Sequence, residues 1–165
     1  EEVVEQLLSA RTIYVLGLRA SAPLAQFLGH YLSYIFPTVY VVTSGISDIF
    51  EQLAHIAEGD VLVGISFPRY TSRTIEAMEL ARKKGATLVA ITDGPLSPLH
   101  ATSDLCLTAK SDMASFVDSL AAPLSLINAL IVALSQRKRQ QVAANFNQLE
   151  EIWAQYNVYL SKNGE

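Results

Sequence analysis

The sequence predicts an α/β protein, a three-layer α/β/α sandwich in which helices cover both faces of a five-stranded parallel sheet. Short apolar runs rich in β-branched residues, such as residues 61–65, alternate with longer segments of helical periodicity. Half of the 165 residues are hydrophobic and 8% are aromatic, which is typical of an α/β protein and not of a disordered chain. We therefore expect one domain over residues 1–165.

Five apolar runs are expected as strands, at residues 12–16, 39–42, 61–65, 87–92 and 105–108. The segments between and around them predict helices at residues 1–9, 21–36, 48–57, 71–83 and 119–135, with a capped helical turn at 97–99. Strands connected through helices run parallel. A flavodoxin-like order 2-1-3-4-5 would place the point where the strand order reverses between the first and third strands, and ligands bind at such points.

Residues 60–74 carry the strongest local signal, because a buried strand, a turn and a helix start follow one another there. Ser66 stands where the strand ends, and Pro68 cannot continue a strand ladder. Thr71 or Ser72 can then cap the helix. A helix start with hydroxyls and free backbone N–H groups favours an anion, so we expect a phosphate or carboxylate at this place.

The turn after the first strand, residues 17–21, has a similar character. Ser21 is a good helix N-cap, and Pro23 follows just inside the predicted helix. In the expected strand order, the loops that carry Ser21 and Ser66 would face each other. Simple helix capping explains Ser21, Thr71 and Ser72 equally well one at a time, and their convergence favours ligand binding.

The order of these motifs resembles a known family. Four segments carry the likeness: Gly17-x-x-x-Ser21, Ile65-Ser66…Thr71, Ala90-Ile-Thr92 and Ser97-Pro98-Leu99. Together they resemble a SIS (sugar isomerase) domain, most closely the effector-binding domain of RpiR-type transcriptional regulators. The resemblance implies a five-stranded parallel sheet that binds phosphorylated sugars, with serines and threonines after the first and third strands holding the phosphate. It also implies an N-terminal helix-turn-helix domain outside this sequence.

The sequence differs from the family pattern at both loops. The first loop is usually Gly-x-Gly-x-Ser, and Arg19 stands at the second glycine. The third-strand loop is usually Ser-x-Ser-Gly-x-Thr, and Pro68 and Arg69 replace its Ser and Gly. An arginine offers a planar fork that matches carboxylate or phosphate. The arginine side chains would then hold the ligand anion where relatives use backbone contacts, or the site would prefer a carboxylate ligand. The alternative is that both arginines are solvated surface residues.

These arguments predict a ligand site that has no catalytic residue, cofactor or metal. The residues expected to contact the ligand are Arg19, Ser21, Ser66, Arg69, Thr71 and Ser72. The first function hypothesis is a sensor, which binds a small anionic metabolite such as a phosphosugar and controls an attached DNA-binding domain. The second is an aldose–ketose phosphosugar isomerase, which needs a general base; Glu51 and Glu76 are the candidates. The three histidines lack metal-ligand spacing.

Charge and cysteine content limit the partners and the compartment. Twelve Lys and Arg against 16 Asp and Glu give a net charge of −4, which argues against DNA binding by this segment itself. DNA would be bound only through a separate domain, which we expect upstream because the sequence starts at Glu1 without a methionine. No apolar run is long enough to span a bilayer, and the lone Cys106 fits a cytoplasmic protein.

The C-terminal part predicts an oligomer. The helix at 119–135 is apolar nearly all round, and a basic hinge at 136–141 leads to a last helix at 140–160. That helix carries apolar residues at alternating spacings of four and three: Val142, Phe146, Leu149, Trp153, Tyr156 and Leu160. We expect this seam to pack either on its own domain or on a partner subunit, and we predict a homodimer or higher oligomer.

Overall fold

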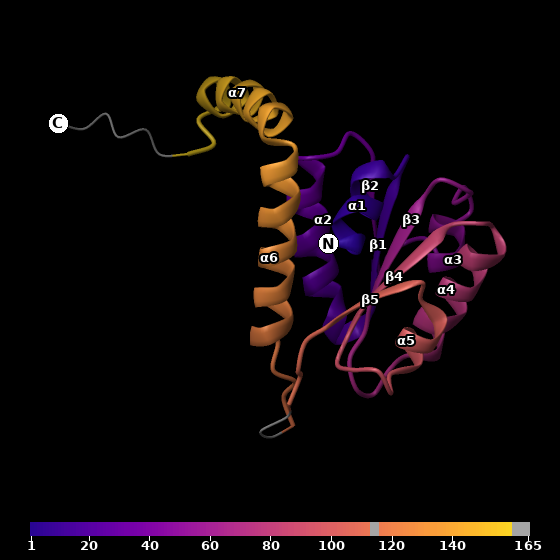
Figure 1. Ribbon diagram of the computed structural model, residues 1–165. Helices are drawn as coiled ribbons and strands as arrows, with labels where there is room; N and C mark the ends of the chain where they lie inside the picture. Colours follow the sequence, from indigo (N-terminus) through magenta and orange to yellow (C-terminus); the bar gives the residue numbers. More distant parts are fainter. Residues whose placement is uncertain (113–115, 160–165) are drawn as a thin grey trace.

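A computed structural model describes residues 1–112 and 116–159 and contains the expected parallel sheet (Figure 1). Its five strands lie in the order β2-β1-β3-β4-β5, and all neighbouring pairs are parallel. The fold class and strand order predicted from the sequence are therefore confirmed. The strands are β1 (Ile13–Gly17), β2 (Val39–Val42), β3 (Val61–Ile65), β4 (Thr87–Thr92) and β5 (Leu105–Thr108).

Helices cover both faces of the sheet, as Figure 1 shows. One face packs against α1 (Glu2–Ser9), α2 (Ala22–Ser33) and α6 (Ala121–Arg137). The other packs against α3 (Ile49–Gln52), α4 (Ser72–Lys83) and α5 (Pro98–Thr102). The central strands β1 and β3 are buried at every position, because apolar side chains on both of their faces contact a helix layer.

The register of β1 and β3 positions the two loops that the sequence singled out. Gly17 and Ile65, the last residues of these strands, pair directly with each other. Since neighbouring strands lie about 4.8 Å apart, the chain leaves both strands at nearly the same place. A side chain at Gly17 would meet the Ser21 carbonyl oxygen at 2.6 Å and the Ala25 Cβ at 2.7 Å. Glycine thus lets α2 start directly above the end of β1.

The helix predicted over residues 48–57 is wrong in length, since α3 ends at Gln52. Asp48 and Glu51 form the capping box that starts this helix. The turns that follow are tighter than an α-helix, with bonds from Ala54 N–H to the Glu51 carbonyl and from Ile56 N–H to the Leu53 carbonyl. The buried carboxylate of Asp60 then accepts the Ala57 N–H at 2.9 Å and draws the chain into β3.

The capping roles expected for Ser21 and Thr71 are also wrong in detail. Both residues precede a helix, α2 and α4 respectively, but neither side chain accepts a capping hydrogen bond. The short 3-10 helix η1 (Arg19–Ser21) leads directly into α2, so Ser21 already has helical backbone angles. The Thr71 hydroxyl pairs instead with that of Thr74 at 2.6 Å. The expected cap at Ser97 does form, since its Oγ accepts the Leu99 N–H at 3.2 Å.

The C-terminal helices break at the predicted hinge. Lys138 ends α6 and precedes α7 (Arg139–Tyr156), and α7 turns away from the rest of the molecule (Figure 1). No residue of α7 is buried. The Phe146 ring lies 5.3 Å from that of Tyr34, the residue that follows α2, while Tyr156 stays 69% exposed. Leu160, the last residue of the predicted seam, lies outside the described residues.

Membrane-spanning helices and metal clusters are both absent from the residues that the structure describes. None of their helices has the length and hydropathy needed to cross a membrane. Nor do residues 1–112 and 116–159 contain a cluster of three or more histidine, cysteine or acidic side chains that could hold a metal ion.

Candidate functional site

A cavity of about 450 Å³ opens at the carboxyl ends of β1 and β3. Parallel sheets bind ligands at this edge, at the point where the strand order reverses. That point lies between β1 and β3, because β2 lies on the far side of β1 and β4 lies on the far side of β3. Three segments line it: the loop after β1, the loop after β3 and the chain just before α6. The lining residues are Leu18, Arg19, Ala20, Ser21, Ser66, Phe67, Pro68, Arg69, Tyr70, Thr71, Asp118 and Leu120.

Two serine hydroxyls stand at the base of this cavity. Ser21 and Ser66 are each only 6% exposed and belong to the lining. Within the described part of the chain, neither hydroxyl has a hydrogen-bond partner, and no fully enclosed side-chain polar atom is left without one. Neither hydroxyl is therefore fully enclosed, and because both residues line the cavity, a ligand oxygen can take the place of water there.

Arg19 and Arg69 share a backbone conformation that is unusual for arginine. Their φ angles are 54° and 66°, in the left-handed region. This region costs an ordinary L-residue roughly 1–2 kcal/mol relative to the right-handed one. Both are the positions at which the family pattern has glycine, so the loops keep the glycine conformation while carrying a long cationic side chain. Strain of this kind is found where a binding site requires it.

The charges around the cavity do not balance. Arg19 and Arg69 are its two cations, and Asp118 is the one carboxylate that the described residues place in its lining. Asp118 Oδ2 lies 3.9 Å from Arg69 Nη2, and the two side chains are 20% and 74% exposed. A loose pair of this kind contributes about 0–1 kcal/mol. The cavity therefore keeps an excess positive charge that suits a small anion.

Tyr70 connects the loop after β3 to the end of β4. Its hydroxyl donates to Asp93 Oδ1 at 2.6 Å, and Asp93 follows directly after β4. Burial first, and the hydrogen bond to Asp93 second, raise the pKa of Tyr70. Thr92 Oγ1 also lies 3.1 Å from the same carboxylate oxygen. Asp93 thus holds the loop after β3 and lies outside the cavity lining.

The predicted site residues do not all meet in the cavity. Arg19, Ser21, Ser66, Arg69 and Thr71 belong to its lining. Ser72 does not, because it starts α4 with its side chain exposed. Whether any of these residues contacts a ligand remains a prediction.

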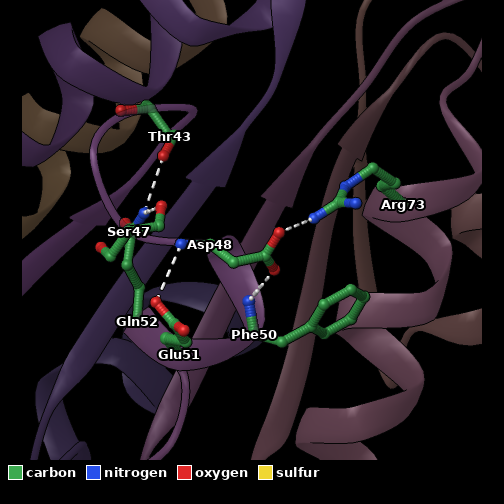
Figure 2. Close-up of polar contacts among 7 residues, drawn as sticks. All are labelled: Thr43, Ser47, Asp48, Phe50, Glu51, Gln52 and Arg73. Atoms are coloured by element: carbon green, nitrogen blue, oxygen red, sulfur yellow. Dashed lines mark hydrogen bonds and ion pairs between the residues drawn. The ribbon is translucent and has the colours of Figure 1, made fainter.

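Arg73, the other arginine of this region, is tied to the molecular surface. It forms an ion pair with Asp48, and its guanidinium lies 5.3 Å from the centre of the Phe50 ring. Figure 2 shows Asp48 between Arg73 of α4 and the Phe50 N–H of α3. That N–H first, and Arg73 second, lower the pKa of Asp48. Arg73 therefore joins two helices and does not line the cavity.

Sequence reasoning missed three cavity residues, Tyr70, Asp118 and Leu120. Asp118 and Leu120 lie in the irregular chain between β5 and α6, where no periodicity indicates which way a side chain points. The parallel topology supplies the only signal, because the chain leaving β5 starts at the same sheet edge as the two predicted loops.

Comparisons with known proteins agree with this fold. A family model described as SIS domain matches residues 6–133. An uncharacterised HTH-type transcriptional regulator of Caldanaerobacter subterraneus subsp. tengcongensis is 27% identical over 158 residues, which cover 92% of this chain and 55% of that protein. The chain thus spans about half the length of this relative.

Two solved structures have the same fold. The sugar isomerase domain of an RpiR transcription factor from Sphaerobacter thermophilus superposes with a TM-score of 0.86 at 27% identity, covering 91% of this chain and 84% of that one. The Vibrio vulnificus NanR protein complexed with ManNAc-6P superposes with a TM-score of 0.78 at 21% identity, covering 94% of this chain and 60% of that one.

Proposed function

The chain belongs to the SIS domain family, and on this premise we propose that it is the effector-binding domain of a bacterial transcriptional regulator. Its ligand is a small anionic metabolite, a phosphosugar or a related acid, bound in the cavity between the loops after β1 and β3. In this proposal DNA is contacted by a helix-turn-helix domain outside the printed sequence, and the protein works in the cytoplasm. This chain covers only 55% of the length of the HTH-type regulator that matches 92% of it, which supports this arrangement.

One observation carries the proposal of an anionic ligand. Two arginines with left-handed backbone flank a cavity whose base carries two buried hydroxyls without partners in the described part of the chain. A folded domain would lose this strain by having glycine at both positions, so the arginine side chains need a compensating role. The ManNAc-6P carried by NanR is a ligand of the proposed kind, with a phosphate for the arginines and hydroxyls for the serines.

The alternative, a phosphosugar isomerase, lacks its expected base at this cavity. Glu51 accepts the Asp48 N–H in the α3 capping box at 3.1 Å, and Glu76 is exposed on α4. Neither belongs to the cavity lining, and none of the described lining residues is a glutamate or histidine. A coupled assay over pentose and hexose phosphates separates the two functions, since sustained turnover that Asp118→Asn or Glu76→Gln abolishes would overturn the sensor proposal.

Ligand binding itself can be tested by substitutions at the cavity. A compound that binds tightly should lose affinity in Arg69→Ala by about 1.5–3 kcal/mol, the contribution of a hydrogen bond to a charged group. Ser66→Ala should cost less, about 0.5–1.5 kcal/mol, if its hydroxyl makes a single further bond. Isothermal titration against the wild-type domain measures both. Unchanged affinity in both variants would place the ligand elsewhere and refute the proposal.

A further inference from the structure

Asp118 places a carboxylate of the protein itself beside the proposed anion site. It lines the same cavity as Arg19, Ser21 and Ser66, and its Oδ2 faces Arg69 at 3.9 Å. A bound phosphate or carboxylate would need the same guanidinium. The cavity therefore contains both the cations that attract an anionic ligand and one fixed group that repels it.

The position of Asp118 is held by its neighbours on the C-terminal side. The Ser111 hydroxyl donates to the Ser119 carbonyl at 3.2 Å, and Ser111 is only 8% exposed. Leu120 then packs against the core below α1, α2 and α6 and precedes the first residue of α6. With residues 119 and 120 fixed, the Asp118 side chain stays close to the cavity even when its contact with Arg69 breaks.

We propose that Asp118 is a tethered competitor that occupies Arg69 in the ligand-free domain and must be displaced by the ligand anion. This inference rests on the proposed function, because it names the group that the ligand replaces. It assigns Asp118 a specificity role: the carboxylate lowers the affinity for any small anion, so that only a ligand with enough further contacts to the cavity binds well. Such discrimination by an unfavourable contact is a general route to specificity.

The geometry favours competition over a permanent salt bridge. At 3.9 Å the pair is too long for a charge-assisted hydrogen bond, which lies near 2.7–2.9 Å. Arg69 is also largely exposed, so its attraction to Asp118 is screened by water and salt. An incoming phosphate can offer two oxygens to the guanidinium fork in bidentate geometry, and it can therefore replace Asp118 without first breaking a strong contact.

The opposite role would be a direct ligand contact, in which Asp118 accepts a hydrogen bond from a sugar hydroxyl. The two roles predict opposite effects of removing the charge. A competitor lowers affinity, so Asp118→Asn should bind an anion more tightly, whereas a hydroxyl acceptor should lose affinity in the same variant. A probe without sugar hydroxyls removes that contact and leaves the first effect, and inorganic phosphate, which is mainly a dianion at pH 8, is such a probe.

The experiment is a phosphate titration of the isotope-labelled protein followed by amide NMR, with the shifts of Ser66, Arg69 and Thr71 reporting on the cavity. Relative to the wild type, Asp118→Asn should bind phosphate roughly three- to tenfold more tightly, the combined effect of a lost exposed ion pair and a lost repulsion. Asp118→Glu keeps the charge and should bind like the wild type. Asp112→Asn, an exposed aspartate of the same segment outside the cavity lining, is the matched control and should change nothing.

Two results would overturn the inference, and they are distinguishable. If phosphate shifts the cavity amides and Arg69→Ala weakens it, but Asp118→Asn binds equally or less tightly, then Asp118 is no competitor and the proposed function survives. If phosphate leaves the cavity amides unchanged in both the wild type and Asp118→Asn, the anion site itself is wrong, and the inference fails together with the proposed function. Thermal melts of each variant show that the fold is intact.

Discussion

Replacing Arg69 with glycine should stabilise the fold and weaken ligand binding at the same time. The φ angle of 66° at this residue is one that glycine adopts without steric cost. The comparison should be made with Arg69→Ala, because both variants lose the same side chain and the same loose contact to Asp118. The difference between them isolates the backbone conformation.

The magnitude follows from two opposing terms. Relief of the left-handed conformation is worth roughly 1–2 kcal/mol, and the greater entropy of an unfolded glycine offsets about 0.5–1 kcal/mol of it. Arg69→Gly should therefore be more stable than Arg69→Ala by about 0.5–1 kcal/mol, which corresponds to roughly 1–4 °C in a domain of this size. Both variants should lose about 1.5–3 kcal/mol of affinity for the anion, roughly a 10- to 150-fold change in Kd.

Chemical denaturation and calorimetric titration measure these two quantities. Arg73 supplies the control, because it lies inside α4 and does not line the cavity. At Arg73 the stability difference between the glycine and alanine variants should have the opposite sign. Arg73→Gly should be less stable than Arg73→Ala by up to about 1 kcal/mol, and ligand affinity should be unchanged in both. If Arg69→Gly is no more stable than Arg69→Ala, the backbone at Arg69 is not strained, and the argument from strain to function is refuted.

Two further predictions concern the assembly and the base of the sheet. Because no residue of α7 is buried in one copy of the chain, we predict a homodimer that forms through this helix. In sedimentation experiments, Tyr156→Glu should give monomers and Gln155→Glu should not. A wild-type species near 18 kDa would contradict this prediction. Burial alone would raise the pKa of Asp60, but its bonds to Arg11 and the Ala57 N–H lower it. Its stabilisation is thus present above the unfolded pKa and is lost as pH falls through the lower folded value. Asp60→Asn should lower the free energy of unfolding by about 1.5–3 kcal/mol near pH 7. It should also weaken the loss of stability at acid pH, as measured by denaturant titrations at several pH values. An unchanged loss at acid pH would exclude this role.

The strands could be predicted to within one residue from the sequence, and the reason is physical. A parallel strand covered on both faces needs apolar side chains at nearly every position, and Val61–Ile65 fulfils this with buried residues throughout. Helix lengths were harder, because they also depend on bonds to residues outside the helical pattern. The helix α3 ends at Gln52, and the chain after it is held by the hydrogen bond from the Ala57 N–H to Asp60. Asp60 lies outside residues 48–57, so the helical pattern of that segment does not indicate this bond.

The site was only partly predictable for a similar reason. Ser21 and Ser66 could be assigned to facing loops, because topology alone brings the ends of β1 and β3 together. The left-handed backbone of Arg19 and Arg69 is not a property of arginine, and only the glycines of the family pattern pointed to those positions. Asp118 belongs to a connection without periodicity, so no sequence pattern indicates its approach to Arg69.

We propose that the cavity between β1 and β3 binds a small anionic metabolite through Arg69. A thermal-shift screen of the wild-type domain and Arg69→Ala against phosphosugars, small carboxylates and the matching neutral sugars tests it most directly. A ligand at 100 times its Kd stabilises the folded state by about 2.7 kcal/mol, roughly 5–10 °C for a domain of this size. We predict that at least one anionic compound produces such a rise, that its neutral parent does not, and that Arg69→Ala loses most of it. A rise of equal size in Arg69→Ala, or with the neutral sugar, would contradict the account.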